Sequence, residues 1–267
     1  MYAKTRISAA FDDLINKKAK AFIPYIMAGD PDLDKTAELV LTLEDCGADI
    51  IELGVPFSDP LADGPTIQRA AERALAKGVT LKKVLTLVSG LRKKTNIPIV
   101  LMTYYNPVFK YGGGEFIKDA TECGVDGIIV PDLLPDEEET FITNCKTYAL
   151  DTIFLLAPTS TTKRVQLAAI KSTGFIYYVS ITGITGANII LESSIAQMVN
   201  TIRETSQKPV AVGFGIKTPA EARQVARIAD GVIVGSSIVK AINDSSLDEL
   251  KTYIRALTEA IKTAPDG

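Results

Sequence analysis

One short pattern recurs in this chain and constrains its fold more than any other feature. Cys46-Gly-Ala-Asp-Ile-Ile-Glu-Leu-Gly54 resembles Cys123-Gly-Val-Asp-Gly-Ile-Ile-Val-Pro131, and a shorter copy begins at Ile228. Each copy is typical of a helix end, a tight turn and a short apolar strand that is buried on both faces, as in a parallel sheet. The aspartate of each copy precedes its strand, so we expect it to have a structural role.

Eight apolar runs of this kind alternate with helical patterns. The predicted strands are Ala21–Ala28, Asp49–Leu53, Ile97–Met102, Gly127–Pro131, Thr152–Leu156, Phe175–Ser180, Pro209–Gly213 and Gly231–Gly235. The predicted helices are Leu33–Cys46, Thr80–Thr95, Glu115–Cys123, Asp136–Tyr148, Thr162–Ser172, Ser193–Ser206, Pro219–Ile228 and Ser246–Lys262, with extra helices at Tyr2–Lys17 and, after the second strand, Pro65–Lys77. This α/β pattern predicts a (β/α)8 TIM barrel that forms a single domain over 1–267. A doubly wound open sheet is the alternative, weakened because no Gly-x-Gly-x-x-Gly follows the first strand.

The composition narrows the environment and the partners. The chain has 267 residues, 46% of them hydrophobic, and a net charge of −3 without a basic block, so we expect no nucleic-acid partner. No apolar run approaches the roughly 18 residues of a membrane span, and the first residues lack the apolar core of a signal peptide. The three cysteines are expected to be reduced thiols. These features favour a cytoplasmic protein that does not associate with membranes.

Two carboxylates are the candidate catalytic groups, since the chain contains no histidine. Glu52 ends the second predicted strand within an apolar run, and Asp63 lies in the loop that follows. Burial raises the pKa of such an acid and lets it give and take protons near neutral pH. A structural ion pair would also explain Glu52. Capping of the helix that begins at Pro65 would also explain Asp63.

Small residues follow three consecutive predicted strands. They are Gly183-Ile-Thr-Gly186 after the sixth, Gly213-Phe-Gly215 after the seventh and Gly235-Ser-Ser237 after the eighth. Such residues let backbone N–H groups and the start of a short helix approach an anion, which predicts a phosphate site. Ordinary turns, which also need glycine, are the alternative.

The residues needed for zinc catalysis and for catalysis through a lysine imine are not found where those mechanisms require them. Without histidine or a cysteine cluster, a zinc-type metal site is not expected. No lysine lies in the second half of any predicted strand, and Lys217 falls beyond the seventh, so an imine-forming lysine is not expected either. If the barrel cleaves a carbon–carbon bond of a phosphorylated compound, the substrate itself must supply the electron sink.

The same residues carry a resemblance to a known family. Phe22-Ile-Pro-Tyr-Ile-Met-Ala-Gly-Asp-Pro31 and Glu52-Leu-Gly-Val-Pro-Phe-Ser-Asp-Pro-Leu-Ala-Asp-Gly-Pro-Thr-Ile-Gln68, with Gly183–Gly186 and Gly213–Ile216, resemble the alpha subunit of tryptophan synthase over essentially the whole chain. The resemblance implies a carbon–carbon lyase that cleaves indole-3-glycerol phosphate into indole and glyceraldehyde 3-phosphate. Protonation of the indole at C3 makes the C=N electron sink.

The resemblance also implies roles for individual residues. Glu52 would be the general acid–base, and Asp63 would accept the indole N–H. Four side chains would surround the indole, and five residues would close around it or hold the phosphate. The first set is Phe22, Met102, Tyr177 and Phe214; the second is Thr185, Gly186, Gly215, Gly235 and Ser236. Tyr177 and Tyr178 point opposite ways in a strand, so only one can line the pocket. For Phe22 and Phe214, a place in the hydrophobic core is the alternative to contact with a flat apolar ligand.

Partner and cofactor follow from the same resemblance. It implies a beta subunit that holds pyridoxal phosphate and consumes the indole in an alpha2–beta2 assembly, whereas this chain needs no cofactor of its own. The segment 56–60 and the Asn106–Pro107 turn resemble the surfaces that meet the partner. One departure is Ile181, where the family more often has an arginine associated with closure of the loop. A subunit that binds substrate without catalysis, and an isomerase of sugar phosphates, are the other hypotheses.

Overall fold

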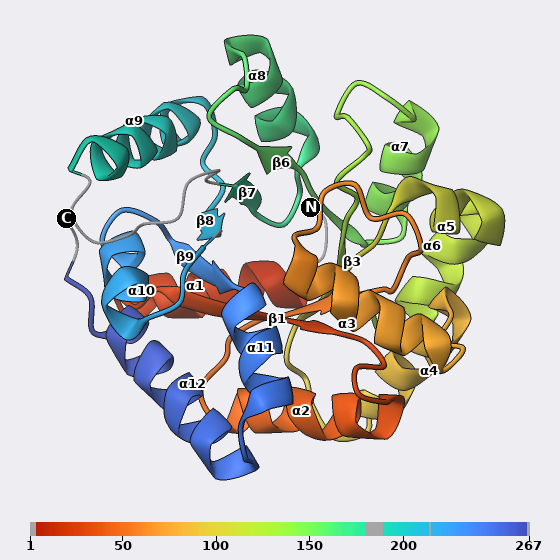
Figure 1. The fold of residues 1–267 in the computed structure, drawn as a ribbon. Helices are drawn as coiled ribbons and strands as arrows, with labels where there is room; N and C mark the ends of the chain where they lie inside the picture. Colours follow the sequence, from red (N-terminus) through yellow and green to blue (C-terminus); the bar gives the residue numbers. More distant parts are fainter. Residues whose placement is uncertain (1–3, 180–188, 214, 266–267) are drawn as a thin grey trace.

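The strands form a closed parallel barrel (Figure 1). The computed structural model describes residues 4–179, 189–213 and 215–265, without the side chains of 189–193. Within these residues the strand order is β5-β4-β3-β2-β1-β9-β8-β7-β6, and all the pairings are parallel. The strands are β1 (Ala21–Met27), β2 (Ile51–Gly54), β3 (Ile99–Met102), β4 (Gly127–Ile129), β5 (Asp151–Ile153), β6 (Leu155–Leu156), β7 (Ile176–Val179), β8 (Val210–Gly213) and β9 (Gly231–Val234).

The barrel closes at the predicted fifth strand, Thr152–Leu156. This segment is divided into β5, which pairs with β4, and β6, which pairs with β7, with Phe154 between them. One continuous segment therefore supplies both ends of the strand order. The prediction of a (β/α)8 TIM barrel is confirmed, and the open-sheet alternative is wrong.

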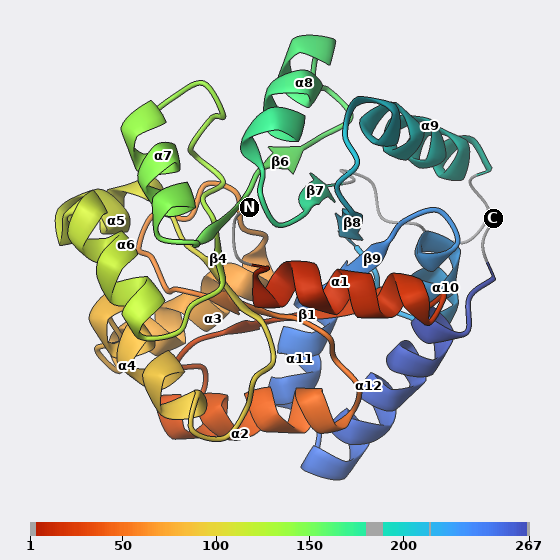
Figure 2. The same ribbon diagram turned by 180° about the vertical axis from the view of Figure 1, so that it is seen from behind.

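Helices surround the barrel wall (Figures 1 and 2). They are α1 (Arg6–Asn16), α2 (Leu33–Asp45), α3 (Pro65–Ala76), α4 (Leu81–Leu91), α5 (Tyr105–Tyr111), α6 (Gly113–Glu122), α7 (Glu139–Thr147), α8 (Thr162–Lys171), α9 (Ile189–Thr205), α10 (Pro219–Ala226), α11 (Ser236–Asp244) and α12 (Leu247–Lys262). The extra helices α1 and α3 are where the sequence predicts them. The segment of α5 was interpreted as a turn at Asn106–Pro107, and α11 was expected only as a short helix start. In the described residues, none of the helices is both long and apolar enough to cross a membrane.

The inside of the barrel is packed by alternate residues of each strand. Apolar side chains from β1, β3, β8 and β9 meet there with side chains of α1, which lies across the amino ends of the strands (Figure 2). The main contributors are Ile7, Phe11, Leu14, Ile23, Val100, Ala211 and Ile233. The opposite strand faces pack against the outer helices in a second cluster. One end of the barrel is thus filled, and the carboxyl ends of the strands are left for a cavity.

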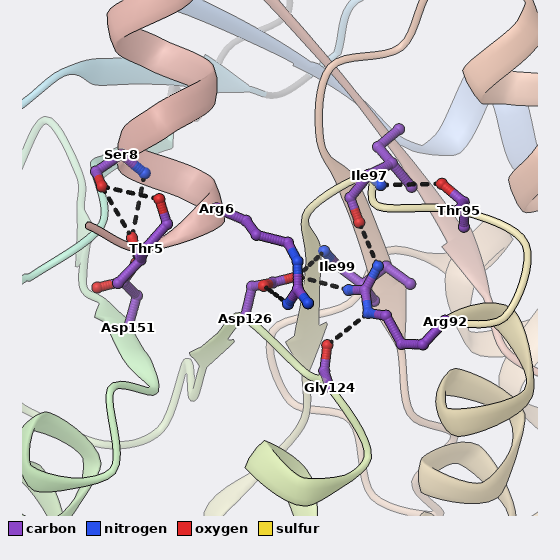
Figure 3. Close-up of polar contacts among 10 residues, drawn as sticks. All are labelled: Thr5, Arg6, Ser8, Arg92, Thr95, Ile97, Ile99, Gly124, Asp126 and Asp151. Atoms are coloured by element: carbon purple, nitrogen blue, oxygen red, sulfur yellow. Dashed lines mark hydrogen bonds and ion pairs between the residues drawn. The ribbon is translucent and has the colours of Figure 1, made fainter. Parts of the chain in front are cut away.

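Asp126 connects α1 to the barrel at this filled end (Figure 3). It lies just before β4 and forms ion pairs with Arg6 of α1, at 2.8 Å, and with Arg92, at 2.6 Å. Its Oδ2 also accepts a hydrogen bond from the backbone N–H of Ile99 at 2.7 Å. Asp49 and Asp230 likewise each join an ion pair to a backbone N–H bond. The structural role expected for the three repeated aspartates is confirmed.

Candidate active site

A cavity of about 720 Å³ opens at the carboxyl ends of the strands. Its wall combines residues that lie in or follow β1, β2, β3, β6, β7, β8 and β9 with one face of α11. Both candidate carboxylates, Glu52 and Asp63, lie in this wall. The fold therefore brings together two acids that are eleven positions apart in the sequence. They meet at the end of the barrel where TIM-barrel enzymes carry their active sites.

Glu52 projects into the cavity from β2. Its register neighbours are Tyr25 on β1 and Val100 on β3, and its exposed fraction is only 1%. Within the described residues its Oε2 has no hydrogen-bond partner, and the carboxylate forms no ion pair there. Burial, and then the negative charge of Asp63, raise the pKa of Glu52 to about 8. Among the described residues Glu52 has no cationic partner, which argues against the alternative of a structural ion pair. With this raised pKa, Glu52 carries its proton at neutral pH.

Asp63 lies at the end of the loop between β2 and α3. The N-cap of α3 is Gly64, and no side chain makes the capping hydrogen bond, so the structure does not support a capping role for Asp63. Burial raises the pKa of Asp63 to about 6, and the hydroxyl of Tyr104 counteracts part of this rise. At neutral pH Asp63 is therefore mostly ionised, whereas Glu52 is mostly protonated.

Tyr104 and Gln68 hold the Asp63 loop in place. The Tyr104 hydroxyl accepts a hydrogen bond from the backbone N–H of Ala62 at 2.9 Å. The Gln68 side chain donates to the carbonyl oxygen of Asp63 at 2.8 Å. Tyr104 follows the end of β3, and Gln68 lies on α3. The position of the Asp63 loop is therefore fixed by two elements outside the loop itself.

The structure corrects the placement of Phe22. This residue is fully buried on the outer face of β1, in the cluster that packs against the helices, and does not line the cavity. Tyr25 lines the cavity instead. Side chains alternate along a strand, so Tyr25 lies on the same face as Ile23 inside the barrel, and Phe22 lies on the other. The alternation of side chains along this strand is visible in the sequence and would have placed Tyr25, rather than Phe22, in the cavity wall.

Tyr177 and Met102 lie in the cavity wall, as the resemblance implies. Tyr178 faces the outer cluster, so Tyr177 is the one tyrosine of the pair that reaches the cavity. A Cβ on Gly54 would lie 2.1 Å from the Tyr25 hydroxyl oxygen. The phenol on β1 therefore occupies the space that a side chain at Gly54 of β2 would need, on the same face of β2 as Glu52.

The small residues after β8 and β9 also reach the cavity. Gly215, Gly235 and Ser236 line it, and Gly235 is the N-cap of α11 without a side-chain cap. The first N–H groups of a helix have no acceptor within the helix, so those of α11 are available to an anion. Gly215 has a φ of +69°, which favours glycine at this position. Thr185, Gly186, Phe214 and Ile181 lie outside the described residues.

Sequence reasoning missed several other parts of the wall. Leu155, Lys217, Lys240 and Tyr253 line the cavity. From the sequence, Lys217 was considered only as an imine-forming lysine, and no role was assigned to the other three. The helical spacing of Lys240 from Ser236 would have identified it once α11 was placed. Among the described residues, no group of three or more acidic, histidine or cysteine side chains could hold a metal ion.

A TIM barrel with a buried glutamate and a half-buried aspartate in a cavity at the carboxyl ends of its strands defines a barrel enzyme of the acid–base type. A family model for the tryptophan synthase alpha chain matches residues 11–265. The chain belongs to this family, whose members are lyases of tryptophan biosynthesis and work with a beta subunit as partner.

Individual relatives agree over nearly the whole chain. The tryptophan synthase alpha chain of Geotalea uraniireducens is 50% identical over 258 residues, which cover 97% of each chain. The alpha subunit structure from Legionella pneumophila is 38% identical with a TM-score of 0.89, covering 97% of this chain and 99% of the other. Tryptophan synthase from M. tuberculosis, in an aminoacrylate-bound form, is 36% identical with a TM-score of 0.88 over 97% and 100% of the two chains.

Proposed function

We propose that this chain cleaves indole-3-glycerol phosphate by a retro-aldol reaction in which Glu52 moves the protons. Glu52 donates its proton to C3 of the indole, and the ring becomes an indolenine cation. The ionised Glu52 then takes the proton of the glycerol hydroxyl next to C3. The C3–carbon bond breaks, its electrons restore the indole, and the hydroxyl carbon leaves as the aldehyde of glyceraldehyde 3-phosphate.

Asp63 is proposed to stabilise the cation that forms midway. Its carboxylate accepts the hydrogen bond of the indole N–H, where positive charge develops when C3 is protonated. The pKa values support this division of roles, because near pH 7 Glu52 has a proton to give and Asp63 has a negative charge to offer. The unpartnered Oε2 of the buried Glu52 is the observation that carries the proposal.

The remaining contacts are proposed from the cavity wall. Tyr25, Met102 and Tyr177 would contact the indole, with Tyr25 in the role first assigned to Phe22. Backbone N–H groups of Gly215, Gly235 and Ser236 would hold the phosphate. We also propose roles for residues outside the described part of the chain: Phe214 at the indole, Gly186 at the phosphate and Thr185 as a partner of Asp63.

We further propose that the chain forms one cytoplasmic domain over 1–267, assembles as alpha2–beta2 with the beta subunit, and needs no cofactor itself. Pyridoxal phosphate belongs to the beta subunit, which would consume the indole. Indole release that does not respond to added beta subunit would contradict the coupling between the two.

The test of the mechanism is indole release from indole-3-glycerol phosphate by Glu52→Gln and Asp63→Asn. We expect each substitution to lower kcat by roughly 10² to 10⁴ with a small change in KM, since both groups act on the reacting atoms. Glu259→Gln, which removes an exposed carboxylate on α12, is the control and should turn over normally. Normal turnover by Glu52→Gln would refute the mechanism and favour a different barrel reaction.

A further inference from the structure

Two lysines in the cavity wall have no part in the proposed chemistry. Lys217 lies two residues after Gly215, in the loop between β8 and α10, and Lys240 lies on α11 one turn after Ser236. Both side chains are exposed. Each therefore lies at the edge of the cavity, near the residues that are proposed to hold the phosphate. These residues, Gly215, Gly235 and Ser236, are called the phosphate cradle below. We refer to Lys217 and Lys240 as the rim lysines.

The geometry of α11 directs Lys240 toward the cradle. Ser236, Lys240 and Asp244 all line the cavity and follow one another at intervals of four residues, so they share one face of the helix. The Cα of Lys240 is about 6 Å along the axis from that of Ser236. Helical side chains lean toward the N-terminus of their helix, so the ammonium group leans back over the first turn. Asp244 lies a further turn away from the cradle.

The backbone of Lys217 is held on both sides. Its N–H donates to Glu221 Oε2 at 2.7 Å, and its carbonyl oxygen accepts from the Tyr253 hydroxyl at 2.8 Å. Glu221 also accepts from the N–H of Thr218 at 3.0 Å, so its carboxylate is engaged in the cap of α10. Within the described residues, the ion pairs include neither rim lysine. Both ammonium groups are therefore available to a ligand.

We propose that the rim lysines attract the phosphate dianion of the substrate and guide it into the cradle. The cradle supplies backbone dipoles but no net charge, and the chain as a whole has a net charge of −3. Asp63 and Asp244 add negative charge to the same cavity, whereas Glu52 is mostly protonated near pH 7. A dianion approaching this surface gains from local cations, because charged clefts raise the local concentration of a ligand of opposite sign. The proposal rests on the proposed function only in taking a phosphorylated ligand.

The test compares the double variant Lys217→Gln/Lys240→Gln with the native chain. At low salt we expect KM for indole-3-glycerol phosphate to rise about tenfold, with kcat within about twofold. The native kcat/KM should fall as ionic strength rises from about 0.01 M to about 0.15 M, where the Debye length shrinks from roughly 30 Å to 8 Å, and the variant should lose most of this dependence. Lys217→Arg/Lys240→Arg should keep both properties of the native chain.

Lys93→Gln is the matched control. Lys93 is also exposed, but it follows α4 at the amino ends of the strands, on the side of the barrel away from the cavity. The substitution Lys93→Gln removes one positive charge from the molecule, as each of the two rim substitutions does, and we expect it to leave KM and the salt dependence at their native values. An effect as large as that of a single rim lysine would show that net charge alone matters, and would overturn the proposal.

Binding of glycerol 3-phosphate, measured by calorimetry, separates this proposal from the proposed reaction. The Kd should rise about tenfold in the double variant at low salt, whether or not the protein releases indole. A native Kd and salt dependence in the double variant would overturn the role of the rim lysines. Failure to release indole, together with lysine-dependent binding of glycerol 3-phosphate, would refute the reaction alone.

Discussion

The buried carboxyl of Glu52 predicts that a conservative substitution will make the protein more stable while strongly lowering its kcat. Glu52→Gln keeps the shape of the side chain but cannot ionise. In the native chain the pKa of Glu52 is raised from 4.5 to about 8, chiefly by burial. The folded state therefore retains a proton that the unfolded chain has lost at intermediate pH, and native stability falls as pH rises through this window.

The size of the effect follows from the same two values. Each pH unit of difference corresponds to about 1.4 kcal/mol, so the interval from 4.5 to about 8 limits the cost of Glu52 to about 5 kcal/mol above pH 9. Linkage gives about 1 kcal/mol at pH 5, about 3 kcal/mol at pH 7 and about 4 kcal/mol at pH 8. The advantage of Glu52→Gln in free energy of unfolding should grow in this order.

Urea unfolding at pH 5, 7, 8 and 9 measures this advantage. The chain has 9 tyrosines and no tryptophan, so tyrosine fluorescence and circular dichroism are suitable signals. Asp63, with its pKa of about 6 caused by burial, contributes a pH dependence that both proteins share. Glu259→Gln, as the exposed control, should follow the native curve. An advantage of Glu52→Gln that stays constant from pH 5 to pH 9 would refute the reasoning, because an unperturbed Glu52 predicts no change across this range.

Two further predictions concern activity and folding. The pH profile of kcat/KM should be bell-shaped, rising as Asp63 ionises near pH 6 and falling as Glu52 loses its proton near pH 8, and Asp63→Asn should remove the rising limb from whatever activity remains. Arg92→Met should lower the free energy of unfolding by about 3 kcal/mol, since it leaves Asp126 buried with one cation fewer, whereas Lys93→Met at the next, exposed position should change it little. Urea unfolding measures the second effect, and equal stability of the two variants would contradict it.

The barrel was predictable because its strands are short, apolar and repeated. The Asp49, Asp126 and Asp230 copies mark the start of β2, β4 and β9, and their aspartates serve the backbone as expected. The division of the fifth strand at Phe154 was not predictable, because pairing on two sides depends on the whole circumference of the barrel. The helix α5 was missed because Asn106–Pro107 is typical of a turn, whereas Pro107 lies in the first turn of a helix, where it needs no N–H acceptor.

The candidate site was predictable where the chemistry lies on a strand. Glu52 was identified from its position at a strand end. Strand alternation allows only one of Tyr177 and Tyr178 to face the pocket, and the family resemblance selects Tyr177; both Glu52 and Tyr177 line the cavity. Phe22 was placed wrongly because its parity relative to Ile23 was not applied. Lys217 and Lys240 were not predicted for another reason. Each lies after a strand end, so its direction depends on the packing of the loop or helix that bears it, and Lys240 becomes recognisable by its spacing from Ser236 only once α11 is placed.

The position of α1 limits the routes by which substrate can enter the barrel and products can leave it. Its side chains Ile7, Phe11 and Leu14 seal the amino end of the barrel, and Arg6 bonds to Asp126 on the wall. In the described residues, the barrel is therefore closed at the amino ends of its strands and is not an open channel. Neither substrate nor products can pass along the barrel axis through this filled end, so all of them must use the side of the cavity at the carboxyl ends of the strands. Turnover would then be limited by exit whenever the aldehyde phosphate stays bound between the rim lysines.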